Sequence, residues 1–164
     1  MNEKYIIRHA DMSDLEKITE LERSCFTVSE AASAEDFFKR LTSYSDYFWI
    51  LEVGGRIISM INGMVTNDSD LKDNMYHNAE LHDKDGKWQM IFGVETHPDF
   101  QRNGYAGLLM ERVIADAISD KRAGLVLTCK EKLIPYYQKF GFKNEGISDS
   151  VHGNTLWYQM RKSL

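Results

Sequence analysis

The sequence predicts a single α/β domain, built as a mixed sheet with helices on both faces. Strand-like and helix-like runs alternate along all 164 residues, without an internal repeat or a proline-rich linker. A long strand-like run that ends at Thr96 is followed by a glycine turn and a helical pattern. No shift in composition marks a second domain, so we expect residues 1–164 to fold as one unit.

Composition limits the kind of protein before any motif is considered. The chain is 43% hydrophobic and 12% aromatic, which are values of a globular protein. Its net charge of −5 argues against nucleic acid as a partner and is compatible with a cationic substrate such as an amine. The N-terminus is too polar for a signal peptide, and no stretch has the length of a membrane span. We therefore expect a cytoplasmic protein without a membrane partner.

The two cysteines, Cys25 and Cys129, stand alone in the sequence. Neither has the paired spacing of a zinc site, and two isolated cysteines give no disulfide framework. Cys129 follows an apolar run, which favours packing over a catalytic role. We expect two buried thiols in a reducing compartment, and no metal.

The first third of the chain predicts a strand at Tyr5–Arg8 and then two helices. Ser13 and Glu16 have the spacing of a capping box, which predicts that the first helix starts there. The second helix is expected to start near Ser33. The inner faces are expected to carry Leu15, Ile18, Leu21 and Cys25 in the first helix, and Ala34, Phe37, Phe38 and Leu41 in the second.

A β-hairpin and a long irregular segment are expected next. The strand-like runs Phe48–Val53 and Arg56–Val65 flank Gly54-Gly55, a pair that suits a tight primed turn. Asn67–Gly86 is polar, charged and irregular. Loops of this length within a compact domain are usually functional or mobile. The segment is therefore expected to be either a substrate lid or an ordinary surface loop.

The second half begins with a long predicted strand, Trp88–Thr96, and continues after a glycine turn with a helix over Tyr105–Ile118. Leu125–Thr128 predicts a short apolar strand. Leu133–Phe140 predicts a short helix, which Gly141 closes in the left-handed conformation. The core face of the longer helix is expected to carry Ala106, Leu109, Met110, Val113 and Ala117. The last strands are expected at Phe142–Ile147 and Thr155–Arg161.

The turn Gln101–Gly107 is the most informative stretch of the chain. It connects a strand to a helix, so several backbone N–H groups are left unpaired at the helix start, where the dipole favours an anion. Its spacing Gln-x-x-Gly-x-Ala is neither the dinucleotide fingerprint nor the P-loop, which needs Gly-Lys-Ser/Thr. The turn therefore predicts a phosphate site of another kind.

Three stretches resemble the GNAT family of acetyl-coenzyme A-dependent N-acetyltransferases. They are His97 to Gly104, Cys129 to Phe142 and Gly153 to Met160. Within the family they are similar to the arylalkylamine branch, which includes the serotonin-acetylating enzymes. The Pro-aromatic-Tyr-x-x-Phe-Gly-Phe piece that starts at Pro135 is the most specific, and the order of predicted elements is also similar to the GNAT fold.

The resemblance implies that acetyl-coenzyme A is the co-substrate. It puts the pyrophosphate on the backbone amides of the turn, and the pantetheine arm beside the preceding strand. The implied cofactor-binding residues are Val94, Glu95, Thr96, Gln101, Arg102, Asn103, Gly104, Tyr105, Ala106 and Gly107. Gly104 and Ala106 are expected to matter because larger side chains would hold the phosphates off the backbone.

The resemblance also implies a general acid, Tyr137. A phenol with a reference pKa of about 10 is protonated at neutral pH and can donate a proton to the leaving thiolate. Residue type alone favours a core tyrosine here, and the surrounding motif favours the catalytic role. Tyr136 is expected to pack.

The general base is where the sequence departs from the arylalkylamine pattern. That branch uses two histidines on the strand before the phosphate loop, and Met90 and Phe92 occupy their places. Neither side chain can accept a proton. They alternate with other apolar residues, which predicts a hydrophobic amine pocket or simple core packing. The candidate bases Glu80, His82, Glu95 and His152 are each more typical of solvated surface residues, so the base stays unassigned; His97 is expected only to shape its turn.

We therefore expect an N-acetyltransferase that moves an acetyl group to a primary amine, either aryl-alkyl or another alkyl amine. Two alternatives remain. One is acetylation of a protein, at its N-terminus or at a lysine, and the other is a non-catalytic sensor of acyl-coenzyme A. The missing histidine pair keeps the sensor open, and Tyr137 counts against it. The oligomeric state is open, with a homodimer as one option.

Overall fold

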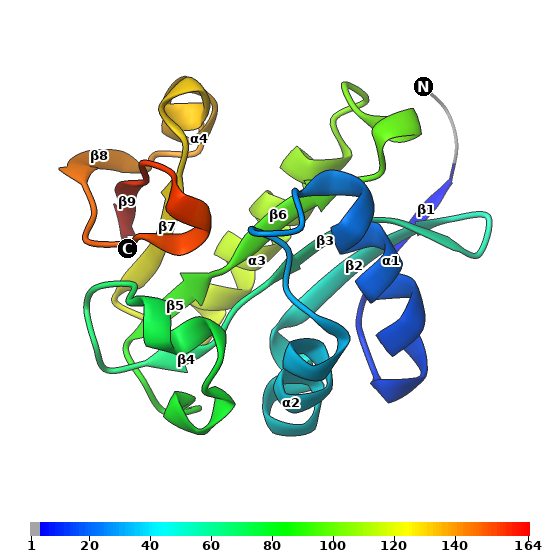
Figure 1. Ribbon diagram of the computed structural model, residues 1–164, viewed down its shortest axis with the longest axis horizontal. Helices are drawn as coiled ribbons and strands as arrows, with labels where there is room; N and C mark the ends of the chain where they lie inside the picture. The colour runs from blue at the N-terminus through cyan, green and yellow to red at the C-terminus, as the bar shows by residue number, and fades with distance from the viewer. Residues whose placement is uncertain (1–3) are drawn as a thin grey trace.

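The computed structural model describes residues 4–164, which form two sheets with helices on both sides (Figure 1). The strands are β1 (Tyr5–His9), β2 (Phe48–Val53), β3 (Arg56–Asn62), β4 (Val65–Thr66), β5 (Trp88–Ile91), β6 (Gly93–Thr96), β7 (Gly124–Cys129), β8 (Lys143–Ile147) and β9 (Tyr158–Ser163). The α-helices are α1 (Leu15–Cys25), α2 (Ala34–Tyr44), α3 (Tyr105–Ser119) and α4 (Ile134–Gln138).

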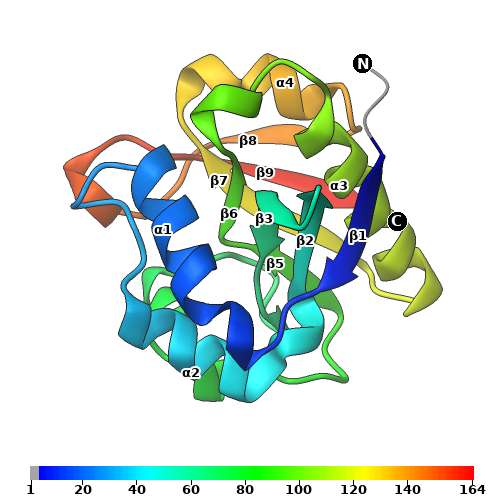
Figure 2. The ribbon, with the colours of Figure 1, turned by 90° about the vertical axis from the view of Figure 1, so that its right-hand side faces the viewer.

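The strands are ordered β1-β2-β3-β6 in one sheet and β4-β5-β7-β9-β8 in the other. β5 and β7 run parallel and the other pairs are antiparallel, so the predicted mixed arrangement is confirmed. Figure 2 shows α1 and α2 on one side of the sheets and α3 on the other. Both faces of the central strands are therefore buried, and the first four residues of β2, Phe-Trp-Ile-Leu, are all apolar and buried.

The predicted strand Trp88–Thr96 is interrupted at Phe92. Its first part, β5, pairs with β7 as far as Ile91 and Leu127, whereas its second part, β6, pairs with β3 in the other sheet. β7 continues to Cys129 along β9. The two sheets therefore part beyond Phe92, and one edge of β6 has no strand partner.

Several predicted boundaries and faces were wrong. The capping box at the first helix is formed by Asp11 and Asp14 around a short 3-10 turn, because the chain turns two residues earlier than the Ser13 pattern indicates. Phe38 lies on the outer side of α2 and is 51% exposed. Arg56–Val65 is not one strand: the chain bends at Gly63, where a Cβ would lie 1.8 Å from the Met90 carbonyl oxygen.

Other local predictions were confirmed. Ser33 caps α2, and its hydroxyl accepts a hydrogen bond from the Asp36 N–H at 3.1 Å. Gly141 follows α4 with a φ of 92°, as the left-handed prediction required. Of the two cysteines, Cys129 is buried, whereas Cys25 is only half-buried.

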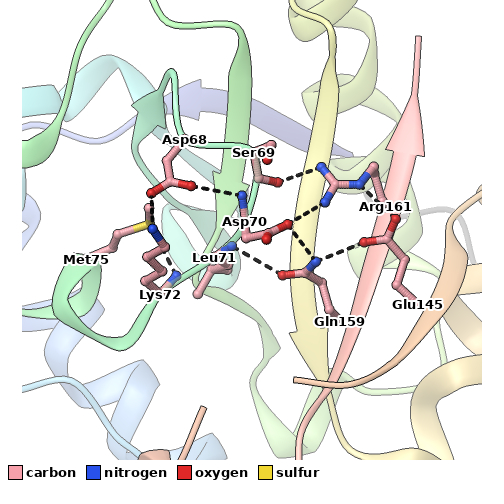
Figure 3. A network of polar contacts seen from close by, with 9 residues as sticks. All are labelled: Asp68, Ser69, Asp70, Leu71, Lys72, Met75, Glu145, Gln159 and Arg161. Carbon is pink, nitrogen blue, oxygen red and sulfur yellow. Dashed lines mark hydrogen bonds and ion pairs between the residues drawn. The ribbon is translucent and has the colours of Figure 1, made fainter. Parts of the chain in front are cut away.

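The segment 67–86 is neither an ordinary surface loop nor a detached lid, because it contributes to the core. Its buried side chains are Leu71, Met75, Tyr76 and Ala79. Arg161 of β9 binds the Asp70 carboxylate at 2.7 Å, and Gln159 donates to the same carboxylate at 3.0 Å (Figure 3). The same two side chains also bind Glu145 of β8. The segment is therefore tied to both C-terminal strands.

Candidate functional site

A cavity of about 90 Å³ lies at the place where β6 and β7 part. Gly93 and Val94 of β6 and Cys129 of β7 form the walls that belong to the sheets. Tyr137 of α4 lines the cavity from one side and Glu22 of α1 from the other. The C-terminal segment before β9, which includes His152 and Trp157, also lines it. The cavity therefore joins elements that are far apart in the sequence.

Tyr137 is buried, and its hydroxyl has no hydrogen-bond partner among residues 4–164. Burial raises the pKa of its phenol, and the neighbouring Cys129 and Tyr136 raise it further. The ring packs edge-on against Tyr136 and Phe142, with centroids 5.1 and 6.2 Å away. Tyr137 is therefore a protonated donor held in a fixed position at the wall of the cavity.

Tyr136 lies beside it and is half-buried. Its ring packs edge-on against Phe140, with centroids 5.3 Å apart. This packing agrees with the expected role of Tyr136.

The glycine turn before α3 has the donors that an anion needs. Gly104 is the N-cap of α3 with a φ of 83° and gives no side-chain cap, and Arg102 also has a positive φ of 66°. The first backbone bond into the helix runs from the Leu108 N–H to the Gly104 carbonyl. In the described part of the chain, the N–H groups from Arg102 to Gly107 have no acceptor. They stay free to bind a ligand.

Side chains hold this turn in shape without using those donors. The Asn103 amide donates to the Phe100 carbonyl at 3.1 Å, and Gln101 donates to the Thr96 carbonyl at 3.1 Å. His97 accepts from the Asp99 N–H at 3.1 Å, so it shapes the turn as expected. Gln101 and Asn103 therefore contact the loop itself, and Tyr105 is buried in the core.

Comparison with known proteins identifies the family of this chain. A model of the acetyltransferase (GNAT) family matches residues 15–142. The chain belongs to this family. It is an acetyltransferase that uses acetyl-coenzyme A as the acyl donor.

Serotonin N-acetyltransferase of Mesocricetus auratus is 24% identical over 158 residues, which are 92% of this chain and 73% of that protein. The loading GNATL domain of CurA from Lyngbya majuscula superposes with a TM-score of 0.84 at 17% identity, over 98% of both chains. The GphF GNAT-like decarboxylase, solved with isobutyryl-CoA, has a TM-score of 0.78 at 19% identity, over 96% of this chain and 98% of that one. At these identities the structures establish the GNAT fold.

Met90 and Phe92, the expected pocket residues, have different surroundings in this acetyltransferase. Met90 is fully buried in the core between the sheets and α2, because β5 is paired on both edges there. Core packing, the second of the two expectations, therefore describes Met90, and its place in the pocket was wrong. Phe92 lines the cavity, where its ring lies under the Arg40 guanidinium at 4.9 Å.

The four candidate bases also lie in different surroundings. Glu80 is exposed, and the His82 Nδ1 accepts from the Val65 N–H at 3.0 Å, so it has a structural role. His152 lines the cavity, with its Nε2 2.8 Å from the Glu30 carbonyl oxygen. Glu95 was expected to be solvated, which was wrong: it is 3% exposed.

The sequence did not reveal a polar cluster beside Glu95. It consists of Glu22 from α1, Arg40 from α2 and Asn62 from β3, all buried. Each helix carries its charged residue on the apolar face, Glu22 next to Leu21 and Arg40 three residues after Phe37. A charge on the buried face of an amphipathic helix is the signal that could have identified them.

No group of three or more His, Cys, Asp or Glu residues within 4–164 has the arrangement of a metal site. In the same part of the chain, no helix is long and apolar enough to span a membrane. The cavity is lined by carboxyl, imidazole and phenol groups, which can accept or donate protons, and by the Arg40 guanidinium, which stays charged.

Proposed function

We propose that this enzyme acetylates a small primary amine, aryl-alkyl or another alkyl amine, with Tyr137 as the general acid. The observation that carries the proposal is the hydroxyl of the buried Tyr137, which has no hydrogen-bond partner among the described residues and lines a cavity at the unpaired edge of β6. A cavity of about 90 Å³ suits the amine end of a small molecule better than a folded protein surface. The similarity to serotonin N-acetyltransferase supports the same class of acceptor.

The binding of the donor follows from free backbone groups. The N–H groups from Arg102 to Gly107 would hold the pyrophosphate, since they converge at the start of α3 and have no other acceptor. The pantetheine arm would run along the unpaired edge of β6, at Val94, Glu95 and Thr96. Of these residues, Val94 lines the cavity, so the thioester would reach Tyr137 there.

The chemistry assigned to Tyr137 is proton donation to the leaving sulfur. A thiol has a pKa of about 8.5, and its thiolate leaves more readily when a neutral phenol protonates it. Burial keeps Tyr137 neutral, because it raises the pKa of the phenol. Tyr137 therefore remains a proton donor across the whole pH range in which amines lose their protons.

A thiol-release assay tests this function. Acetyl-coenzyme A is offered with 2-phenylethylamine, tryptamine, spermidine, free amino acids and peptides, and the released thiol is measured. Turnover with an arylalkylamine supports the proposal, turnover with peptides alone indicates a protein substrate, and binding without any turnover indicates a sensor.

Tyr137→Phe should lower kcat by about 10² to 10⁴, the range for loss of a general acid, with little change in acetyl-coenzyme A affinity. Tyr136→Phe is the matched control, because it removes the neighbouring phenol and should leave kcat unchanged. If Tyr137→Phe turns over as fast as the parent enzyme, Tyr137 has no role in the chemistry.

A further inference from the structure

Two carboxyl groups come together at the wall of the cavity: Glu22 from α1, which lines it, and Glu95 from β6, which lies behind Gly93. A Cβ built on Gly93 would lie 3.4 Å from Glu95 Oε1 and 3.9 Å from Glu22 Oε1. Both carboxyl groups therefore lie against the same position of β6. Gly93 and Glu22 both line the cavity. The absence of a side chain at Gly93 therefore keeps the pair next to the space where the amine would react.

The pair has few hydrogen-bond donors. Glu22 Oε2 accepts from the Ala32 N–H at 2.7 Å, but Glu22 Oε1 and both oxygens of Glu95 receive no hydrogen bond from residues 4–164. Two buried carboxylates that share a single donor repel each other and lose their hydration, so one of them takes up a proton. Burial first, and then the charge of Glu22, raise the pKa of Glu95 well above its ordinary value.

Other charged and titratable groups face the pair from each neighbouring element. Arg40 of α2 lowers the pKa of Glu95, but by less than burial and Glu22 raise it. Its guanidinium donates to Asn62 Oδ1 and to the Tyr76 carbonyl, both at 2.9 Å, and its Nε has no partner among the described residues. Cys25 of α1 also faces the pair, and burial raises the pKa of its thiol, which keeps it neutral.

We propose that Glu22 is the catalytic base of the acetyl transfer and that Glu95 is the positioning residue that shares its proton. This inference rests on the proposed function, and it supplies the base that Met90 and Phe92 cannot provide. Glu22 lines the same cavity as Tyr137. Glu22 and Glu95 do not occupy the places of the two histidines of the arylalkylamine branch, which are Met90 and Phe92 in this chain.

The proton and bond changes balance as follows. The ammonium form of the substrate gives one proton to the deprotonated pair and becomes a neutral amine. Its nitrogen forms a bond to the acetyl carbon, the carbon–sulfur bond breaks, and the leaving thiolate takes the proton of Tyr137. The tyrosinate then takes the remaining extra proton from nitrogen. The pair finally releases its proton to water, so the products are the amide, the thiol and one proton.

This role predicts a pH dependence with a defined sign. The pair must lose its shared proton before it can accept one from the amine, so kcat should rise as the pH rises through the raised pKa of the pair. In Glu95→Gln, the repulsion between like charges is gone. The group with the raised pKa is absent from this variant, so the acid limb of kcat should then move to lower pH.

Two variants and two amines test the role of the pair. Glu22→Gln keeps an acceptor for Ala32 and should lower kcat with 2-phenylethylamine by about 10² to 10⁴. The loss should be far smaller with 2,2-difluoro-2-phenylethylamine, whose fluorines lower the pKa of the amine so that it arrives unprotonated. Glu20→Gln, on the exposed side of the same helix, is the control and should keep full activity.

Carbon-13 NMR of the glutamate carboxyl groups follows the pair without substrate. We expect one carboxyl to titrate well above the ordinary range in the parent protein, to shift part of the way down in Glu22→Gln because burial of Glu95 remains, and to disappear in Glu95→Gln. Absence of such a signal, or full activity of Glu22→Gln with 2-phenylethylamine, overturns the proposal while the acetyltransferase function stands. If the signal is present but the parent protein acetylates no amine, the proposed function fails and the role of the pair fails with it.

Discussion

Gly104→Glu should abolish the stabilisation that acetyl-coenzyme A gives to this protein. In the free protein, a Cβ at position 104 would have no atom within 4 Å, so a side chain fits without a clash. The φ of 83° is unfavourable for any residue other than glycine, which costs about 1 to 2 kcal/mol. The fold should therefore survive, with a modestly lower Tm.

The magnitudes separate the loss of binding from this loss of stability. Acetyl-coenzyme A at 100 times its Kd stabilises the folded state by about 2.7 kcal/mol. For a domain of 164 residues this corresponds to a rise in Tm of about 5 to 11 °C. A carboxylate about 4 Å from one phosphate charge is repelled by about 4 kcal/mol at an effective dielectric constant of 20. The repulsion exceeds the stabilisation, so the shift should vanish.

The assay is thermal unfolding with and without acetyl-coenzyme A, with Gly146→Glu as the matched control. Gly146 also has a positive φ of 93° and open space around its Cβ position, and it lies on β8, away from the turn. Both variants add the same charge under the same backbone constraint. A full ligand shift in Gly104→Glu would refute the phosphate site at the turn, and a lost shift in Gly146→Glu would refute the explanation by local repulsion.

Two further predictions concern the scaffold. The Arg8 guanidinium holds the pKa of Asp14 below its ordinary 3.8, so this stabilisation is present above that pH and is lost as the pH falls through the folded pKa. Asp14→Asn should lower Tm at pH 7 and reduce the fall of Tm in acid, and an unchanged acid profile would contradict this. Arg161→Met should speed amide hydrogen exchange at 68–76 and leave α3 unchanged, because it removes the ion pair with Asp70 and leaves Gln159 as the remaining partner (Figure 3); equal exchange would mean that the Arg161 contacts do not hold the segment.

The fold could be predicted where one local rule decides the conformation. α3 has a continuous apolar face, Gly104 and Gly141 are needed for positive φ, and Ser33 is followed by a carboxylate at the capping distance. The first helix start was missed because Ser13 and Asp11 both suit a cap. The two candidates are two residues apart, and in the structure Asp11 forms the cap with Asp14, whose carboxylate also binds Arg8.

The candidate site was predictable only in part, because its residues depend on contacts between distant elements. Tyr137 and the glycine turn lie in contiguous motifs, so the sequence indicated them directly. Glu22, Arg40 and Glu95 are separated along the chain and meet only after α1 and α2 have packed over the sheet. Glu22 and Arg40 gave a signal in the sequence, because each is a charged residue on an otherwise apolar helix face. Such a residue is easily overlooked when a helix is recognised from its apolar positions alone.

The interruption of the strand at Phe92 explains why Met90, one of the two positions matched to the histidines, lies in the core. Before the break, β5 is paired on both edges, so Met90 is sealed where a histidine would stand in the arylalkylamine branch. After the break, β6 pairs with β3 alone, and α1 packs over it, so Glu95 meets Glu22 beside the cavity. Because the chain passes from one sheet to the other at Phe92, the position of Met90 cannot hold a base, whereas a carboxyl pair lies beside the cavity after it. In this chain the proposed base lies on α1 and the proposed acid on α4, and both line the cavity between the sheets.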